Sequence, residues 1–497
     1  MKFQSTRNKN LRLDSAETIV KGLSEDGGLF VPVEIPVLKK GEITELSKFS
    51  YCERAKRIFS KFMTDFSEEE LLDCAEKAYI GNFEEEEPTQ IVKLGENVYM
   101  LELWHGPTCA FKDMALQILP RFLVKASEKV GDGKKIVILT ATSGDTGKAA
   151  LEGFCDVEGT EIIVFYPANG VSKIQQLQMQ TQKGENVSVC GVIGNFDDTQ
   201  TAVKKIFTDE NIRAKLGENG KRFSSANSIN MGRLLPQVVY YVSAYADLVK
   251  NGEISDGETV NVTVPTGNFG NILAAYYAKQ MGVPFGKLIC ASNANNVLTD
   301  FLSTGVYDVN RDFYMTESPS MDILVSSNLE RLIFELCEKE DGYVREVMKS
   351  LREHGKYCVP DEILAKIKEI FAAGYTDDEG AENRIKMLFG EYSYLCDTHT
   401  AVAVDVYENY KTETGDETKT IIASTASPYK FPRAVLKAIS GENEPDDFEA
   451  AKKIEILSGL SMPKQLSELS EKEPRFTKVC GREEMADFVL STVGGDC

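Results

Sequence analysis

The sequence predicts an α/β protein built on parallel β-sheets, and three observations indicate this class. Short apolar runs, such as KKIVILTA at 134–141, alternate with longer amphipathic segments. Each apolar run ends where a polar loop begins. The chain has 497 residues, of which 42% are hydrophobic, so it can bury a large core in two or more domains. Buried strands that alternate with helices are typical of parallel sheets covered on both faces.

The first 90 or so residues contain helical patterns, such as YCERAKRIFSKFM at 51–63. They end in the acidic run 84–87 and Pro88, which indicate a solvated linker. The strand–helix alternation follows. The sequence predicts strands at 134–141, 160–167 and 185–194, and helices at 143–154, 171–182 and 196–207.

The alternation resumes further along the chain, with predicted strands at 258–265, 286–292 and 418–424. Between about 300 and 390 the pattern is charged and helical, as in PDEILAKIKEIFAAG at 360–374, and it predicts a helical insertion. From about residue 440 the sequence predicts terminal helices.

Charge and composition exclude several classes of partner. The formal net charge is −21, which disfavours a nucleic-acid partner because a phosphate backbone attracts a basic surface. No stretch approaches the roughly 20 apolar residues that cross a bilayer, and the start lacks the apolar core of a signal peptide. The eleven cysteines are scattered and the three histidines are dispersed. We therefore expect reduced thiols in a cytoplasmic protein, with no metal site and no membrane partner.

The loop PTGNFGN at 265–271 follows a predicted strand and precedes a predicted helix. Gly267 and Gly270 leave room for a ligand against the backbone, and free N–H groups at the helix start can bind an anion such as phosphate. The loop contains no Lys or Arg, and its spacing fits neither a dinucleotide fingerprint nor a Walker loop. The alternative is a tight strand-to-helix turn with no ligand.

Two further loops follow predicted strands. In TATSGDTGKAA at 140–150, the backbone around Gly144 could hold a carboxylate, although an ordinary helix N-cap by Ser143 or Asp145 explains the same residues. In IIASTASPYKFP, Ser424 and Thr425 end a strand, and such hydroxyls often only satisfy backbone groups.

Lys112 follows Phe111 in HGPTCAFKD at 105–113. Partial desolvation of this lysine would lower its pKa and free the amine as a nucleophile. An amine of this kind, together with a neutral phosphate loop, indicates a phosphorylated aldehyde such as pyridoxal phosphate. A surface lysine that extends its ammonium into water is the alternative.

Five motifs in this order resemble those of threonine synthases: HGPTCAFKD, TSGDTG, SSANSINMGRLLPQ, PTGNFGN and STASPYKFPRA. The opening segment STR…GLSEDGGLFVP is similar to the amino terminus of that family, so the likeness spans nearly the whole chain. The resemblance implies the fold type II architecture of pyridoxal-phosphate enzymes, with two parallel-sheet α/β domains and an amino-terminal helical domain. The expected domains are 1–90; 91–135 with 225–430, carrying the insertion at 300–390; 136–224; and carboxy-terminal helices at 431–497.

The resemblance also implies roles for particular residues. Lys112 would bind the aldehyde of pyridoxal 5'-phosphate covalently and act as the catalytic base, and Thr425 would face the pyridine nitrogen. The cofactor phosphate would be held by Gly267, Asn268, Phe269, Gly270 and Asn271. The substrate carboxylate would lie at Ser143, Gly144, Asp145 and Thr146, and the substrate phosphate at Asn227, Ser228 and Arg233. A surface ion pair is the alternative role for Arg233.

In the family, O-phospho-L-homoserine and water give L-threonine and phosphate, so this is the expected reaction, in a monomer or homodimer. A related lyase that releases 2-oxobutyrate, ammonia and phosphate shares the early steps and stays open. A non-catalytic protein that binds phosphate ligands is a third hypothesis. Two residues depart from many relatives, namely Cys109 in place of an aliphatic residue and Ser427 in place of histidine. His105 suits a structural role as well as proton transfer.

Overall fold

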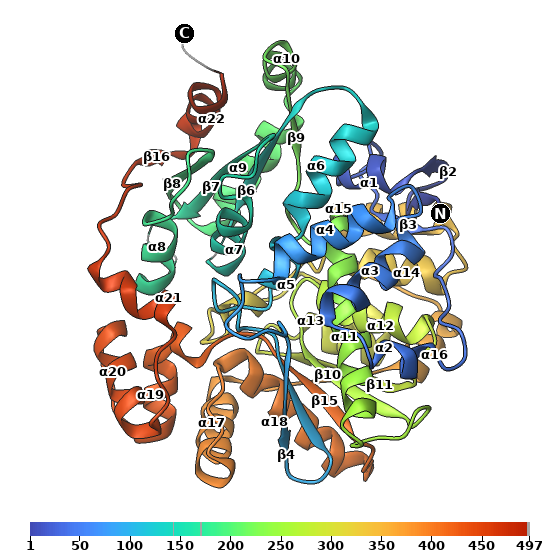
Figure 1. Cartoon of the computed structure of the whole chain (residues 1–497), viewed down its shortest axis with the longest axis vertical. Coiled ribbons are helices and arrows are strands. Elements are labelled where there is room, and N and C mark those ends of the chain that lie inside the picture. The colour runs from blue at the N-terminus through green and yellow to red at the C-terminus, as the bar shows by residue number, and fades with distance from the viewer. Residues whose placement is uncertain (143, 169–170, 495–497) are drawn as a thin grey trace.

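The computed structural model describes residues 1–142, 144–168 and 171–494, and its two largest sheets lie in separate parts of the molecule (Figure 1). The larger sheet has six strands in the order β14-β11-β10-β15-β5-β4, and the smaller has five in the order β16-β8-β7-β6-β9. All neighbours in both sheets are parallel except β4 with β5. The parallel α/β class predicted from the sequence is therefore confirmed.

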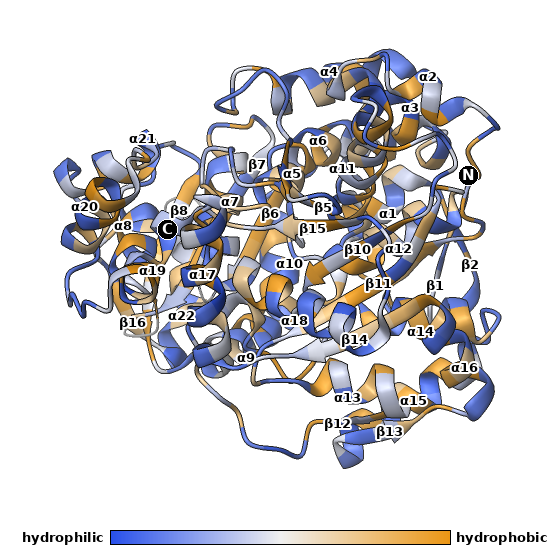
Figure 2. Cartoon of the chain, turned by 90° about the horizontal axis from the view of Figure 1, so that it is seen from below, coloured by the Kyte–Doolittle hydropathy of each residue, from blue (hydrophilic) through white to orange (hydrophobic). Residues whose placement is uncertain are grey.

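The strands of the larger sheet are β4 (Gln90–Leu94), β5 (Val98–Glu102), β10 (Val260–Pro265), β11 (Phe285–Ser292), β14 (Phe371–Tyr375) and β15 (Thr420–Ser424). Every residue of β10 and β15 is buried, so both faces of these strands are covered, and the polar side chains of Asn261 and Thr263 are buried among the valines of β10. The helices α11 (Met231–Lys250), α12 (Gly270–Gln280), α13 (Val297–Thr304) and α18 (Thr398–Thr414) belong to this part of the molecule. In Figure 2 the inner strands are mostly hydrophobic, whereas the covering helices carry both colours.

The smaller sheet contains β6 (Lys135–Ala141), β7 (Thr160–Pro167), β8 (Val187–Ile193), β9 (Lys221–Ser224) and β16 (Val479–Gly481). Its helices are α7 (Asp145–Phe154), α8 (Lys173–Gln180), α9 (Phe196–Thr208) and α10 (Glu210–Glu218). The strands predicted at 134–141, 160–167 and 185–194 correspond to β6, β7 and β8.

The amino-terminal segment contains the expected helices α1 (Ser15–Lys21), α2 (Glu42–Leu46), α3 (Tyr51–Phe62) and α4 (Glu68–Tyr79). It also forms a three-stranded antiparallel sheet from β1 (Phe3–Ser5), β2 (Asn8–Leu13) and β3 (Phe30–Pro32), which the sequence analysis does not predict. The helix α1 packs on α6 (Leu119–Val130), so this segment is continuous with the main core.

The segment 300–390 holds α14 (Leu329–Leu336), α15 (Asp341–His354), α16 (Asp361–Ile370) and α17 (Asp378–Tyr392). A two-stranded ribbon, β12 (Val306–Asp308) with β13 (Lys356–Cys358), accompanies them. The helix predicted over 360–374 is wrong at its end, because α16 stops at Ile370 and the next five residues form β14. Five parallel pairings with β11 stabilise the extended conformation there.

The carboxy-terminal segment forms α19 (Pro432–Ser440), α20 (Asp447–Ser458), α21 (Lys464–Ser467) and α22 (Met485–Val493). Figure 1 shows this segment, in red, running from α19 to α22 beside the smaller sheet. It also contributes β16, which pairs with β8. The residue boundaries predicted for the domains stay predictions. Within the described residues, no helix combines the length and apolarity that crossing a membrane requires.

Candidate active site

Loops after four strands meet at the candidate site. The segments that contain Lys112, Gly267 and Thr425 follow β5, β10 and β15 of the larger sheet, and Asp145 follows β6 of the smaller sheet. Ligands of parallel α/β sheets bind beyond the carboxyl ends of the strands, so the position agrees with this rule.

The amine of Lys112 is buried, and the residue as a whole is 8% exposed. Its Nζ lies 3.2 Å from Ser320 Oγ, 3.4 Å from Asp145 Oδ2 and 5.4 Å from the centre of the Phe111 ring. Burial lowers the pKa of Lys112; the Asp145 charge opposes this effect, whereas the charges of Lys430 and Arg233 add to it. The alternative of a lysine extended into water is therefore wrong.

Backbone contacts fix the position of Lys112 against the segment after β15. Phe111 N donates to Thr425 O at 2.8 Å, and Ser427 N donates to Cys109 O at 3.0 Å. Cys109 has a φ of 58°, in the left-handed region that residues other than glycine rarely adopt. Thr108 donates its N–H and its hydroxyl to the buried carboxylate of Asp113, at 2.8 and 2.6 Å. Two motifs that are far apart in the sequence thus form one unit around the lysine.

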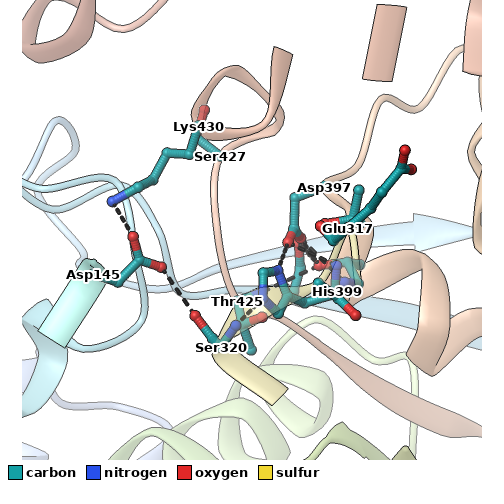
Figure 3. Close-up of polar contacts among 12 residues, drawn as sticks. Asp145, Glu317, Ser320, Asp397, His399, Thr425, Ser427 and Lys430 are labelled. Atoms are coloured by element: carbon teal, nitrogen blue, oxygen red, sulfur yellow. Dashed lines mark hydrogen bonds and ion pairs between the residues drawn. The ribbon is translucent and has the colours of Figure 1, made fainter. Parts of the chain in front are cut away.

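Asp145 is a buried carboxylate between Lys112 and Lys430, and Figure 3 shows its contacts to Lys430 and Ser320. Its Oδ1 accepts from Lys430 Nζ at 2.7 Å and from Gln175 Nε2 at 3.0 Å, and its Oδ2 faces Lys112 and Ser320, each at 3.4 Å. Burial alone would raise the pKa of Asp145, but the charges of Lys430 and Lys112 outweigh it and hold the pKa well below its ordinary value. Asp145 is therefore a fixed negative charge.

The helix start after β6 does not use Asp145 as a cap. Gly144 occupies the N-cap position of α7, and Thr142 Oγ1 accepts from Gly147 N at 2.9 Å and Gly144 N at 3.0 Å. The N-cap alternative for Asp145 is therefore wrong. Ser143 lies outside the described residues, and Thr146 follows Asp145 in the first turn of the helix.

Ser320, in the short 3-10 helix η1 (Pro319–Met321), connects three parts of the site. Its Oγ faces Lys112, its N–H donates to His399 Nε2 at 3.1 Å, and its carbonyl oxygen would lie 2.8 Å from a Cβ on Gly267. His399 Nε2 is an acceptor here, so its Nδ1 carries the proton and donates to Asp397 Oδ2 at 2.7 Å. The pair thus fixes the backbone of Ser320 (Figure 3).

The loop between β10 and α12 contains Gly267, Asn268, Phe269, Gly270 and Asn271. Phe269 has a φ of 62°, and a Cβ at Gly267 would meet backbone, so both positions are tightly constrained. Asn271 Oδ1 accepts from the hydroxyls of Tyr240 at 2.5 Å and Tyr241 at 2.6 Å. This fixes the amide so that Nδ2 is a donor, and Nδ2 is buried with no hydrogen-bond partner among the described residues.

The loop is also held from outside. Asn328 Nδ2 donates to Asn268 O and to Ser228 Oγ, each at 2.9 Å, and Ser326 Oγ donates to Gly267 O at 2.8 Å. Arg331 is buried and donates to the side chain of Asn328 and to backbone carbonyls, including Phe30 O at 2.9 Å. The segment 326–331 thereby connects the glycine loop to the amino-terminal sheet.

Arg233 lies in the first turn of α11, is buried, and donates from Nη1 to Ala226 O at 2.8 Å. Burial lowers its pKa to about 10. Among the described residues no carboxylate pairs with it, so the surface ion pair is wrong. Asn227 N–H donates to Ser225 Oγ at 3.2 Å, and Ser228 bonds to Asn328.

Thr425 and Ser427 lie beside the lysine segment. Thr425 N donates to Thr400 Oγ1 at 3.2 Å, and Thr400 Oγ1 in turn donates to Asp397. Ser427 is buried and its hydroxyl caps η2 (Pro428–Lys430) by accepting from Tyr429 N. The Thr425 backbone is thus connected to the same Asp397 that orients His399.

His105 is bonded on both ring nitrogens, to Glu102 at 2.8 Å and Glu84 at 3.3 Å, and stacks on Trp104. Burial disfavours its protonated form, but the two carboxylates outweigh burial and raise the pKa to about 9. This environment supports the structural role.

A cavity of about 730 Å³ borders the residues that bind Asp145. Gln175 and Lys430, both bonded to Asp145, line it together with Phe431, Arg433 and Lys437.

Comparisons with known proteins identify the family. Three family models match in succession: "Threonine synthase N terminus" at residues 2–79, "Pyridoxal-phosphate dependent enzyme" at 84–350, and "Threonine synthase, C-terminal" at 400–489. The threonine synthase of Pseudomonas aeruginosa is 35% identical over 478 residues, covering 96% of this chain and 95% of that protein. The chain belongs to the threonine synthase family. The resemblance inferred from the five motifs is confirmed.

One further sequence relative and one solved structure are also similar to this chain. Human "Threonine synthase-like 1" is 42% identical over 434 residues, which cover 85% of this chain but 58% of that protein, so this chain spans little more than half of its length. The crystal structure of pyridoxal-phosphate-bound threonine synthase from Brucella melitensis superposes with a TM-score of 0.88 at 34% identity, covering 99% of both chains. The threonine synthase fold and the cofactor, pyridoxal phosphate, are thereby confirmed.

The residues present fit this cofactor of the threonine synthase family. Lys112 has a buried amine that could bind the aldehyde. The start of α12, where Asn271 Nδ2 has no partner among the described residues, has neutral donors that could bind a phosphate. At Gly267 there is no room for a side chain.

Sequence reasoning missed Lys430, Ser320, His399, Asp397 and Asn328. Lys430 carries a signal that could have been used, because it lies between Tyr429 and Phe431 just as Lys112 follows Phe111. For Ser320 and Asn328 the linear sequence offers no comparable signal.

Proposed function

We propose that this chain is a threonine synthase that converts O-phospho-L-homoserine and water to L-threonine and phosphate. One observation carries the proposal: the buried Nζ of Lys112 and the glycine loop at 267–271 are joined through a single residue, Ser320. An amine and a phosphate cradle at opposite ends of one site match the two ends of pyridoxal phosphate.

Lys112 supplies the reactive amine. Burial favours its neutral form, which would hold the aldehyde and would take the proton from the substrate Cα. When bound, pyridoxal phosphate would supply the electron withdrawal that makes this hydrogen acidic. Ser320 Oγ, at 3.2 Å, can orient the amine during the transfer.

The glycine loop orients the cofactor end of the site. Gly267, Asn268, Phe269, Gly270 and Asn271 would hold the cofactor phosphate with backbone N–H groups and the Asn271 amide.

Thr425 would offer a neutral hydroxyl to the ring nitrogen. Unlike an aspartate, a hydroxyl does not favour a protonated ring, which suits elimination and replacement more than transamination.

The substrate is proposed to be held by two groups. Arg233 is a buried cation with no carboxylate partner in the described part of the chain, so a phosphate dianion would supply the missing charge, with Asn227 and Ser228 as neutral donors. The backbone around Gly144, Asp145 and Thr146, with Ser143, would hold the substrate carboxylate.

A second candidate is a phospho-lyase that releases 2-oxobutyrate, ammonia and phosphate from the same substrate. The chain is 42% identical to "Threonine synthase-like 1" and 35% identical to the Pseudomonas threonine synthase, so a reaction other than that of the synthase is kept as a candidate. Both reactions would use the same early proton transfer at Lys112. They differ in whether water is added to the β carbon before the product leaves the enzyme.

Product analysis decides between the two. Enzyme loaded with pyridoxal phosphate is incubated with O-phospho-L-homoserine, and threonine, 2-oxobutyrate and phosphate are quantified together. Equal amounts of threonine and phosphate support the synthase. If 2-oxobutyrate is the main product, the enzyme is the lyase. If no phosphate is released, both proposed reactions are contradicted.

A further inference from the structure

Lys430 is a buried cation for which the proposed reaction has no role. It is the last residue of η2, its side chain is fully buried, and its Nζ donates to Thr108 O at 3.0 Å besides pairing with Asp145. An unpaired ammonium is costly to bury, so Lys430 needs a negatively charged partner at this position.

The two carboxylate oxygens of Asp145 are used unequally (Figure 3). Oδ1 has two close donors, Lys430 at 2.7 Å and Gln175 at 3.0 Å. Oδ2 has only long contacts among the described residues, at 3.4 Å to Lys112 and to Ser320. N–H···O bonds are strong near 2.7–3.2 Å, so the carboxylate is bound to Lys430 and only weakly to Lys112.

The charges around Lys112 do not balance. The charged groups that face it are Asp145 from α7, Lys430 from η2 and Arg233 from α11, with the neutral Ser320 from η1. One carboxylate can compensate one buried cation fully, and the shorter pair shows which cation it compensates.

We propose that Lys430 is a positioning residue: it binds the carboxylate of Asp145 in a direct ion pair and so keeps the amine of Lys112 available to react with the cofactor aldehyde. The inference rests on the proposed role of Lys112. Without Lys430, the carboxylate would turn to Lys112 as its closest cation. The ammonium form of Lys112 would then be stabilised and its amine less reactive.

The test measures Lys112 directly. Full-length protein freed of cofactor is acetylated with acetic anhydride across a pH series, and acetylation of the Lys112 peptide is quantified by mass spectrometry. In Lys430→Met the midpoint of Lys112 labelling is expected to rise by about one pH unit, which is about tenfold slower labelling below the midpoint. Lys430→Arg, which keeps the cation, is expected to restore the wild-type profile.

Two controls separate positioning from other effects. Lys437→Met removes a half-exposed lysine of α19 that pairs with Glu382 and Glu317, and it should leave the profile unchanged. In an Asp145→Asn background, Lys430→Met should shift the midpoint much less, because no carboxylate is left to turn. An equal shift in both backgrounds would overturn the proposal, since Lys430 would then act only through its own charge.

The outcomes also separate this inference from the proposed function. In the wild type, added pyridoxal phosphate should protect Lys112 from acetylation; absence of protection contradicts the proposed function itself. Protection together with an unchanged profile in Lys430→Met overturns only the role of Lys430. Should Lys430→Met fail to fold by circular dichroism, Lys430→Gln, which keeps a donor for Thr108 O, is measured instead with the same expected shift.

Discussion

At the scale of single residues, one carboxylate, Asp145, distinguishes two buried lysines, Lys112 and Lys430. A reactive amine must lose its proton near neutral pH, which burial favours and a nearby carboxylate opposes. Asp145 stays ionised because two lysines surround it, and its closer bond is to Lys430. The contacts therefore distinguish the two lysines: Lys430 is closely paired with Asp145, and Lys112, which we propose as the reactive amine, is not.

His105 provides a prediction of pH dependence. In the folded protein the pKa of His105 is raised from 6.5 to about 9, so the folded state binds the imidazole proton more tightly than the unfolded state does. The stabilisation is fully present below pH 6.5 and is lost as the pH rises towards 9. The shift corresponds to about 3 kcal/mol at most.

In urea unfolding experiments, His105→Gln should therefore be less stable than wild type at pH 6, and the difference should shrink steadily up to pH 9. A difference that is constant over this range, or one that grows with pH, would show that Glu102 and Glu84 do not hold a charged imidazole.

At this scale the sequence predicted residues that belong to long motifs, such as Lys112, Arg233 and Asn271. It did not predict their partners. Ser320 is 175 residues from Asp145, and Lys430 is 322 residues from Thr108, so no local spacing connects them. The buried contacts arise only when the two sheets are placed together.

The glycine loop at 267–271 shows how elements depend on one another. Its position between β10 and α12 follows from the sequence, but its fixed conformation depends on Asn328, which precedes α14 and bonds to Asn268 O. Arg331 and Ser326 complete this support.

Asn328→Ala should weaken the affinity for pyridoxal phosphate about tenfold, because the loss of two hydrogen bonds to the loop and to Ser228 removes on the order of 1–2 kcal/mol. Absorbance titration of cofactor-free protein measures the dissociation constant. Ser327→Ala is the matched control, since Ser327 is only partly buried and its hydroxyl has one long contact, of 3.4 Å, to Asn268 Oδ1. Equal affinities of the Asn328 variant and wild type would contradict the supporting role.

The apolar run 134–141 and the valine-rich run 258–265 predicted strands correctly, and residues on both faces of β6 and β10 are buried. The strand β14 was missed because FAAGY continues the sequence pattern of α16 without a break. Pairing with β11 at the edge of the larger sheet decides its conformation, and that pairing depends on tertiary structure.

At the scale of the whole molecule, the carboxy-terminal segment covers an edge that would otherwise be open. The strand β16 pairs with β8, and Cys480, Met485 and Val489 pack into the core of the smaller sheet. The terminal-helix pattern was visible in the sequence, but a three-residue strand is too short to show periodicity.

Removal of residues 475–497 should expose the edge of β8 and part of that core. We expect the melting temperature, measured by differential scanning calorimetry, to fall by about 5–10 °C, because several kcal/mol of apolar burial are lost. A truncated protein that melts at the wild-type temperature would show that this segment does not stabilise the smaller sheet.

The most direct measurement asks which lysine binds the cofactor. Protein loaded with pyridoxal phosphate is reduced with borohydride, digested, and the modified peptide identified by mass spectrometry. The account predicts the cofactor-derived mass on Lys112, and its loss in Lys112→Ala. Modification of Lys430, the other buried lysine bonded to Asp145, or of any lysine outside this cluster would contradict it.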